Sequence, residues 1–164
     1  MADRDRDGAR LKLREGEWAD APFIVSLGTA AFAPFGDYAP IMRSFLANPS
    51  VTSWIAEADG DPAGFALVET DPKLPGFADL VAIAVEPRHR RTGVGRALLG
   101  RVIDACEEGS ASFLLVLTVA EDNAPAIGLF RAFGFAMVPG IVGRYAGGQV
   151  SRRMAKPLTA NRRP

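Results

Sequence analysis

The sequence predicts an α/β protein in which helices cover both faces of one mixed sheet. Two continuous apolar runs, residues 79–85 (DLVAIAV) and 113–119 (FLLVLTV), are typical of strands that are buried on both faces. The segment between these runs and the segment after the second both have apolar residues at helical spacing. A chain of 164 residues, 48% hydrophobic and 23% charged, has the size and composition of one globular domain.

The other elements follow from the same patterns and from turn residues. Asp59-Gly60-Asp61-Pro62 lies between two β-rich runs and predicts a hairpin turn. In chain order, we predict a strand at 11–14, helices at 17–31 and 38–47, strands at 52–58, 63–70 and 79–85, a helix ending near 108, a strand at 113–119, a helix at 123–133, and strands at 136–142 and 150–157. The order is β-α-α-β-β-β-α-β-α-β-β, and the last two strands are expected to close the sheet as an antiparallel pair. We expect residues 11–158 to form the domain, between flexible polar tails at 1–10 and 159–164.

Charge and composition exclude several classes of function. Nineteen basic residues balance nineteen acidic ones, so the surplus of positive charge that is typical of nucleic-acid binders is missing. No apolar run approaches the roughly 20 residues of a membrane span, and the first ten residues lack the apolar core of a signal peptide. The single cysteine, Cys106, cannot form an internal disulfide. We therefore expect a cytoplasmic protein with no nucleic-acid or membrane partner, and one His with one Cys predicts no metal site.

A short basic segment follows the first apolar strand. Taken as charge alone, Arg88, His89, Arg90, Arg91 and Arg96 are typical of a solvated loop. The same segment, however, contains two glycines and opens a helix, whose first amides have no partner within the helix and lie at the positive end of its dipole. Glycines let such a backbone approach an anion closely. The segment 91–96 therefore predicts a binding site for a pyrophosphate.

Three kinds of phosphate loop were weighed against this segment. The nucleoside triphosphatase loop needs Gly-Lys-Ser/Thr, which the chain lacks. The dinucleotide fingerprint needs a third glycine where the chain has Leu98, so an oxidoreductase is only weakly indicated. The acetyl-coenzyme A loop, R/Q-x-x-G-x-G/A, is matched by Arg90-Arg91-Thr92-Gly93-Val94-Gly95.

Two motifs in the right order resemble the GNAT family of N-acetyltransferases. Val85-Glu86-Pro87, the loop 90–95 and Arg96-Ala97-Leu98-Leu99 are similar to its central motif, and Asn123-x-x-Ala126-x-x-Leu129-Phe130-x-x-x-Gly134-Phe135 to its second. The resemblance covers residues 11–158 and implies the acyl-CoA N-acyltransferase fold. It also implies transfer of an acetyl group from acetyl-CoA to a primary amine of a small molecule or peptide, by direct attack in a ternary complex. A catalytically weak module that binds or senses acetyl-CoA is the alternative, and a homodimer is left open.

The resemblance also implies which residues hold the cofactor. The strand before the loop would bind the pantetheine arm through its backbone, and the loop would hold the pyrophosphate. Asn123 would contact the coenzyme, although a helix N-cap explains it equally well. The implied cofactor residues are Ile83, Ala84, Val85, Arg90, Arg91, Thr92, Gly93, Val94, Gly95, Arg96, Asn123 and Phe130.

The catalytic residues depart from those of many relatives. Phe130 stands where many members place a tyrosine that protonates the thiol, and Thr118 stands where ribosomal-protein acetyltransferases place a glutamate base. Asp79 matches the glutamate base of the histone acetyltransferase branch, or is a strand-edge aspartate; Glu86 is a weaker rival. Tyr145 is our candidate acid.

The second tyrosine, the cysteine and the histidine are the remaining reactive side chains. Tyr38 is an alternative acid, although a packing role explains each tyrosine as well. We expect Cys106 to pack in the core and His89 to lie at the surface. In this fold the first two helices and the last hairpin shape the acceptor groove, and there the sequence has Phe32, Phe35, Asp37, Tyr38, Met42, Phe45 and the loop 72–77. Aromatic residues with few acids predict a moderately apolar acceptor.

Overall fold

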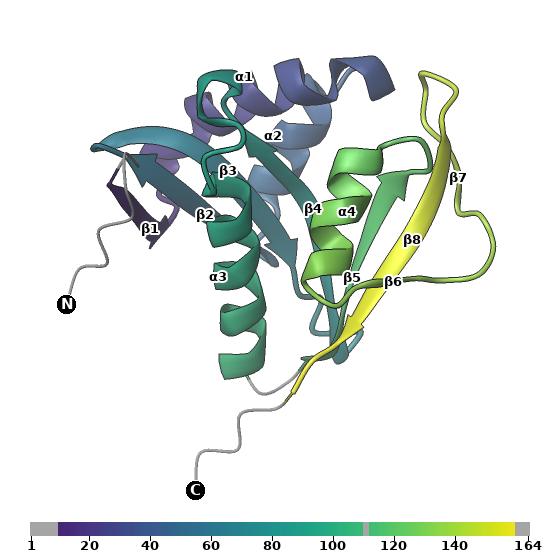
Figure 1. Cartoon of the computed structure of the whole chain (residues 1–164). Coiled ribbons are helices and arrows are strands. Elements are labelled where there is room, and N and C mark those ends of the chain that lie inside the picture. Colours follow the sequence, from purple (N-terminus) through teal and green to yellow (C-terminus); the bar gives the residue numbers. More distant parts are fainter. Residues whose placement is uncertain (1–9, 110–111, 160–164) are drawn as a thin grey trace, which may run out of the picture.

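The computed structural model describes residues 10–109 and 112–159, and these form one eight-stranded mixed sheet (Figure 1). The strand order is β1-β2-β3-β4-β5-β8-β6, with β7 also paired to β8. Strands β4 and β5 run parallel, and the other neighbours are antiparallel. The strands are β1 (Leu11–Glu15), β2 (Val51–Ala58), β3 (Asp61–Glu69), β4 (Gly76–Val85), β5 (Ser112–Ala120), β6 (Ala136–Met137), β7 (Gly143–Arg144) and β8 (Val150–Pro157). The predicted mixed sheet is confirmed.

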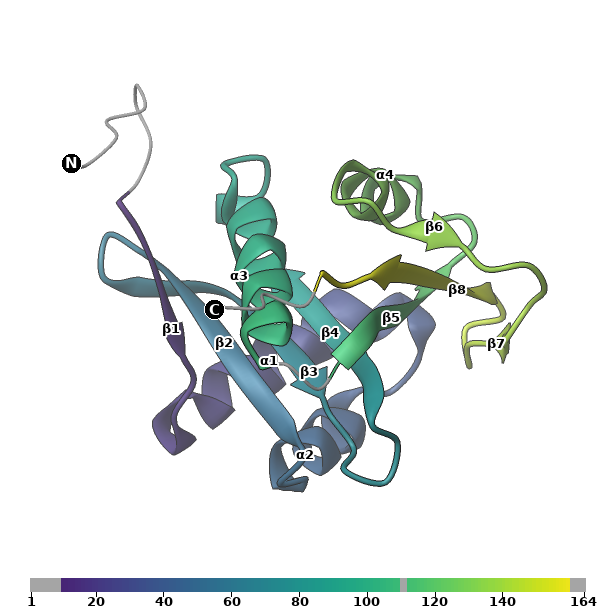
Figure 2. The same cartoon turned by 90° about the horizontal axis from the view of Figure 1, so that it is seen from below.

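Helices cover both faces of this sheet, as predicted. Helices α1 (Ala21–Phe32) and α2 (Ala39–Ala47) lie on one face, and α3 (Val94–Glu108) and α4 (Ala124–Ala132) on the other (Figures 1 and 2). Each face has its own core. Ile24, Met42 and Phe65 are fully buried on the first side, whereas Leu98 and Leu117 belong to the larger cluster on the second.

The first helical segment begins differently from the prediction. A 3-10 turn, η1 (Trp18–Asp20), comes first, and α1 follows it with Pro22 in its first turn. Proline is tolerated there because the first amides of a helix have no partner within the helix. The helix predicted at 38–47 begins at Ala39 with Pro40 in the same position.

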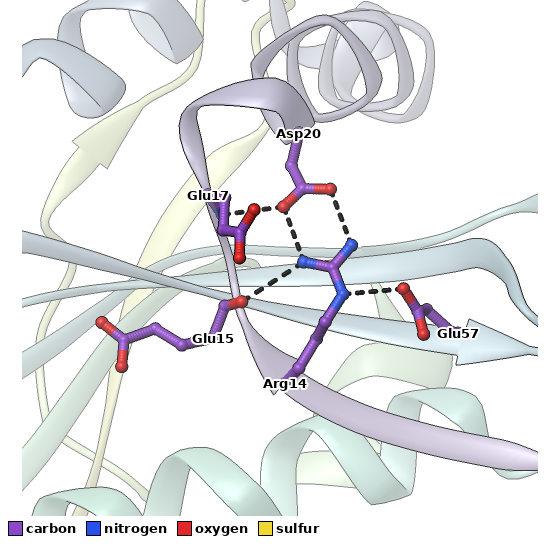
Figure 3. Close-up of polar contacts among 5 residues, drawn as sticks. All are labelled: Arg14, Glu15, Glu17, Asp20 and Glu57. Atoms are coloured by element: carbon purple, nitrogen blue, oxygen red, sulfur yellow. Dashed lines mark hydrogen bonds and ion pairs between the residues drawn. The ribbon is translucent and has the colours of Figure 1, made fainter.

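Arg14 and the carboxylates around it fix this segment against the sheet (Figure 3). Arg14 of β1 donates to both carboxylate oxygens of Asp20, at 2.7 and 2.9 Å, and to Glu57 of β2 at 2.7 Å. The Arg14 hydrogen bond lowers the pKa of Asp20, and Asp20 in turn accepts from the amide of Glu17 at 2.8 Å. These contacts join β1 and β2 to the N-cap of α1. They lie at the β1 edge of the sheet, which is remote from β5.

Three details of the strands differ from the prediction. The hairpin turn is confirmed, but it consists of Asp59 and Gly60 alone, both at positive φ (53° and 91°), and β3 already begins at Asp61. The strand predicted at 136–142 is wrong: β6 ends at Met137, and Gly140 (φ 91°) lies between it and β7. The run 113–119 is not buried throughout, because Phe113 is 68% exposed. Of the predicted tails, all but Arg10 and Thr159 lie outside the described residues.

Candidate functional site

The parallel pair β4–β5 separates partway along its length. Its pairing runs from Gly76 beside Ser112 to Leu80 beside Leu117, and no pair of the described residues continues it. The cause is visible in the β3–β4 register, where consecutive residues of β3 face Leu80 and Ala82, so that Val81 forms a bulge. Beyond the bulge, β4 stays paired to β3 on one edge. Its other edge therefore presents unpaired backbone groups of residues 81–85 to a ligand.

A cavity lies in this gap between the two strands. On one side of the sheet it is walled by aromatic residues of α1, of the turn η2 (Ala33–Phe35), of the N-cap of α2 and of the β7–β8 hairpin, and on the other by α4. The lining residues are Phe32, Phe35, Tyr38, Leu80, Val81, Ala82, Ile83, Leu117, Thr118, Val119, Ala120, Asn123, Ala126, Phe130 and Tyr145. The cavity thus connects the two faces of the sheet, so two molecules could meet in it from opposite sides.

The basic loop lies at the end of β4 and leads into α3. Gly93 is the N-cap of α3 with φ 89°, and it offers no side chain that could cap the first amides. Arg91 is also left-handed (φ 61°), and residues 90–93 are exposed. Arg90 donates from Nε to the carbonyl of Val85 at 3.4 Å, and the Thr92 hydroxyl donates to the carbonyl of His89. The uncapped helix end and its flanking cations fit a pyrophosphate.

The second glycine of the loop, Gly95, packs between β4 and α4. A Cβ on Gly95 would lie 3.6 Å from Val85 Cγ2 and 3.7 Å from Leu129 Cδ2, which are ordinary contacts. Either glycine or alanine therefore fits at this point between β4 and α4. The neighbouring Arg96 guanidinium lies 5.2 Å from the centre of the Phe133 ring, a cation–π contact that joins α3 to α4.

The N-cap explanation of Asn123 is confirmed, and its contact with the coenzyme stays a prediction. Its Oδ1 accepts from the amide of Ala126 at 3.3 Å, which makes it the N-cap of α4, and the residue also lines the cavity. Phe130, about two turns further along α4, is 5% exposed and lies 5.8 Å from the ring of Phe135. Phe130 and Thr118 both line the cavity, so the places of the missing tyrosine and glutamate face it.

Asp79 lies beside the cavity rather than among its lining residues. It precedes Leu80, which does line the cavity, and it faces Glu69 across the β3–β4 pair. Burial raises the pKa of Asp79, the charge of Glu69 adds to that rise, and Arg153 opposes it. A half-buried carboxylate with a raised pKa is a better proton acceptor than an ordinary aspartate. Glu86, the rival base, is the N-cap of the turn η3 (Pro87–His89), away from the lining residues.

The two tyrosines of the chain both line the cavity. Tyr38 lies 5.1 Å from the ring of Phe32, and Tyr145 lies 5.0 Å from the ring of Phe35. Burial, with a smaller contribution from Tyr38, raises the pKa of Tyr145 to about 12, and burial also raises the pKa of Tyr38. Both hydroxyls therefore stay protonated at neutral pH.

Part of the predicted acceptor region does not reach the cavity. Asp37, Met42, Phe45 and the loop 72–77 are not among the lining residues, and Met42 is fully buried between α1 and the sheet. Sequence reasoning missed the bulge at Val81, for which a uniformly apolar strand gives no signal.

The other reactive side chains lie outside the cavity. Cys106 packs in the core at 8% exposure, and burial raises the pKa of its thiol to about 11. His89 is half-buried in η3. Within 10–109 and 112–159, no group of three His, Cys, Asp or Glu residues could hold a metal ion. No helix of these same ranges is long and apolar enough to cross a membrane.

The chain is similar to known acetyltransferases along most of its length. Residues 13–135 match the family described as "Acetyltransferase (GNAT) family". An N-alpha-acetyltransferase of Sulfurisphaera tokodaii is 27% identical over 165 residues, which cover 93% of this chain and 96% of the relative. The L-amino acid N-acetyltransferase AaaT of Escherichia coli is 32% identical over 90 residues, 54% of this chain and 55% of that protein.

Solved structures share the fold. The ribosomal-protein-S18-alanine N-acetyltransferase of Escherichia coli has a TM-score of 0.76 at 25% identity, covering 94% of this chain and 99% of that one. YncA of Salmonella typhimurium, solved with its cofactor acetyl-CoA, has a TM-score of 0.74 at 21% identity, covering 94% and 97%. The fold and the family predicted from the motifs are thereby confirmed. The chain belongs to the GNAT family of N-acetyltransferases, enzymes that take their acetyl group from acetyl-CoA.

Proposed function

We propose that this protein transfers the acetyl group of acetyl-CoA directly to a primary amine of a small molecule or peptide while both are bound. The observation that carries the proposal is the cavity in the gap between β4 and β5, which connects the two faces of the sheet. Two substrates entering from opposite faces would meet there without a covalent enzyme intermediate. Holding two reactants in such a geometry supplies much of the acceleration of a transfer reaction.

The cofactor side is assigned to backbone groups and nearby cations. The free edge of Ile83, Ala84 and Val85 would hydrogen-bond the pantetheine arm, and the exposed amides at the start of α3 would hold the pyrophosphate. The cofactor supplies the acetyl group as an activated thioester. Asn123 and Phe130 would line its path along α4.

Asp79 is assigned as the base, acting through a water because it stands one residue from the cavity. An amine must lose its proton before it can attack, and a carboxylate whose pKa is raised by burial is a better acceptor for that proton than an ordinary aspartate. Tyr145 is assigned as the proton donor to the departing thiol, since its hydroxyl belongs to a cavity residue and stays protonated.

The alternative, a module that binds acetyl-CoA with little catalysis, is favoured by Phe130 and Thr118 at the places of two catalytic side chains. Incubation with acetyl-CoA and a panel of amines, with release of the free thiol as the readout, separates the two. Amine-dependent thiol release supports the enzyme. Tight acetyl-CoA binding without such release from any amine supports the sensing module.

The proposal also covers the acceptor amine, the location in the cell and the oligomeric state. The relatives named above act on protein N-termini and on free amino acids, and these support a primary amine without choosing between peptide and small molecule. A cytoplasmic location stays part of the proposal, and cell fractionation tests it. A homodimer stays part of it as well, and sedimentation of the purified chain tests that.

A further inference from the structure

Two segments far apart in the sequence meet over the amine side of the cavity. The turn η2 (Ala33–Phe35), between α1 and α2, lies against the hairpin between β7 and β8. The amide of Gly147 donates to the carbonyl of Phe35 at 3.2 Å, and Gln149 Nε2 donates to the carbonyl of Pro34 at 2.9 Å. The rings of Phe35 and Tyr145 are 5.0 Å apart. We call these two segments, residues 33–36 and 145–149, the clasp.

The clasp is packed closely at two glycines: space excludes a side chain at Gly147, and at Gly36 a tight contact adds to a φ of 147° that favours glycine. A Cβ on Gly147 would lie 2.2 Å from the Pro34 carbonyl oxygen, and a Cβ on Gly36 would lie 3.1 Å from the Ala146 Cβ. Gln149 Oε1 is buried there without a hydrogen-bond partner among the described residues. An unpaired buried oxygen costs free energy.

The clasp joins η2 to the β7–β8 hairpin, beside the part of the cavity where an acceptor would lie. Phe35 and Tyr145 belong to the clasp and also line the cavity, and Phe32 and Tyr38 continue the same wall. A polypeptide acceptor needs room for its backbone to leave the reacting amine. In the proposed site, the bonds from Gly147 and Gln149 would close the acceptor side against such a backbone.

The lining also limits the chemistry of the acceptor. Aromatic and aliphatic side chains make up most of it, and the lining residues include no Asp, Glu, Lys or Arg. A carboxylate or a second ammonium group of the acceptor would lose water here without gaining an ionic partner, which is costly. An apolar or aromatic body would bury its surface against the rings.

We propose that the acceptor is a small free monoamine with an apolar or aromatic body and no carboxylate, and that the closed clasp excludes polypeptides. This inference rests on the proposed function, since it names the substrate class of that same site. Entry of a peptide would require the clasp to open.

The test uses two coenzyme A conjugates, each joined through an acetyl bridge to its amine: 2-phenylethylamine in one, the N-terminus of a hexapeptide in the other. Titration calorimetry measures their affinities for the full chain. The wild-type protein should bind the phenylethylamine conjugate at least about tenfold more tightly than the peptide conjugate, because the clasp must open for the latter. In Gly147→Ala the new Cβ pushes Pro34 away, and this ratio should fall several-fold.

Two further variants make the test specific. Gly143→Ala lies in the same hairpin, and its Cβ would meet only Ser151 Oγ, at 3.9 Å, so its ratio should stay at the wild-type value. Gln149→Ala removes the bond to Pro34 without adding an atom, and it should lower the ratio in the same direction as Gly147→Ala. Gln149→Ala therefore tests whether the clasp disfavours the peptide conjugate even if Gly147→Ala fails to fold.

The outcomes separate this inference from the proposed function. Equal wild-type affinity for both conjugates, or a ratio that neither clasp variant changes, overturns the inference and leaves the acetyl-CoA site intact. Turnover of the hexapeptide or of free alanine at the rate of 2-phenylethylamine also overturns it. Failure of coenzyme A and both conjugates to bind overturns the cofactor assignment, and the inference with it.

Discussion

The two sides of the cavity are built from different materials. The cofactor side consists of backbone: the free edge of β4, an uncapped helix end and two glycines. The acceptor side consists of aromatic side chains from α1, η2, the N-cap of α2 and the β7–β8 hairpin. Contacts between segments more than a hundred residues apart hold η2 to that hairpin. Backbone chemistry needs a fixed local geometry, which a short motif can encode. The acceptor side depends instead on side chains, which can be substituted without changing the backbone groups of the cofactor side. Changes on the cofactor side should therefore act on affinity for acetyl-CoA, and changes on the acceptor side on turnover.

The largest effect is expected from Asp79→Asn, which removes the proposed base. Loss of a general base should lower kcat by about 100-fold, while the dissociation constant of acetyl-CoA stays at the wild-type value. Steady-state kinetics with calorimetry measures both. Glu86→Gln is the control and should keep wild-type kcat. A wild-type kcat in Asp79→Asn would contradict the role of Asp79 as the base and leave it a strand-edge aspartate.

The same variant should reveal itself in stability against pH. Because burial raises the pKa of Asp79 in the folded protein, the folded state holds this proton more tightly than the unfolded chain does. The wild-type carboxyl therefore costs stability as the pH rises through that raised pKa, whereas a neutral Asn carries no such cost. Asp79→Asn should gain stability over wild type at pH 7, and the gain should disappear below the pKa of an unfolded aspartate, about 3.9. Denaturant unfolding at both pH values checks this, and a variant less stable at pH 7 would contradict it.

Gly93→Ala probes the cofactor side. Its φ of 89° disfavours any Cβ, and although the space around it is open within the protein, that space faces the proposed pyrophosphate. Acetyl-CoA affinity should fall about 30-fold, or roughly 2 kcal/mol, with kcat at saturation little changed. Gly140→Ala is matched in backbone strain, with φ 91° and equally open space, and should bind acetyl-CoA normally. Equal losses in both variants would show that strain alone is responsible.

Tyr145→Phe should have a smaller effect, again on turnover. Removal of a proton donor should lower kcat about tenfold, less than is typical of general acids, because a thiolate can also leave without one. Since the pKa of Tyr145 is about 12, its ionisation should cause no loss of activity between pH 7 and 10. Tyr38→Phe is the comparison, because it removes the other hydroxyl of the cavity. If only Tyr38→Phe lowers kcat, the two tyrosines exchange roles.

Phe130→Tyr should have the smallest effect. The residue is 5% exposed and lines the cavity, so an added hydroxyl would point toward the place where the thiol departs. We expect kcat to stay within about threefold of wild type or to rise, since a second donor can only assist proton transfer. A large loss would mean that α4 is placed differently along the cofactor.

What the sequence could predict follows the same division. The strand, loop and helix at 79–108 were predicted nearly in full, because apolar runs, glycines and helical spacing are local signals. The strand predicted at 136–142 was wrong, since Pro139-Gly140 interrupts a ladder that only β8 defines. The first α-helix begins at Ala21 and not at residue 17, because Pro22 favours a place in the first turn of a helix.

On the acceptor side, the sequence pointed to four aromatic residues that do line the cavity: Phe32, Phe35, Tyr38 and Tyr145. The motifs pointed to the loop and to Asn123, but no pattern in β4 indicates the bulge at Val81 that parts it from β5. The clasp was not predictable either. Gly147 and Gln149 carry no motif, and their role comes from contact with Pro34 and Phe35, which depends on the whole fold.

The most direct measurement of the central claim is an NMR titration of the isotope-labelled protein with coenzyme A and, separately, with pantetheine, which lacks the diphosphate. Coenzyme A should shift the amide signals of both 83–85 and 92–96, whereas pantetheine should shift only those of 83–85. Equal shifts of 92–96 by pantetheine, or no shift of them by coenzyme A, would contradict the assignment of the pyrophosphate to the start of α3.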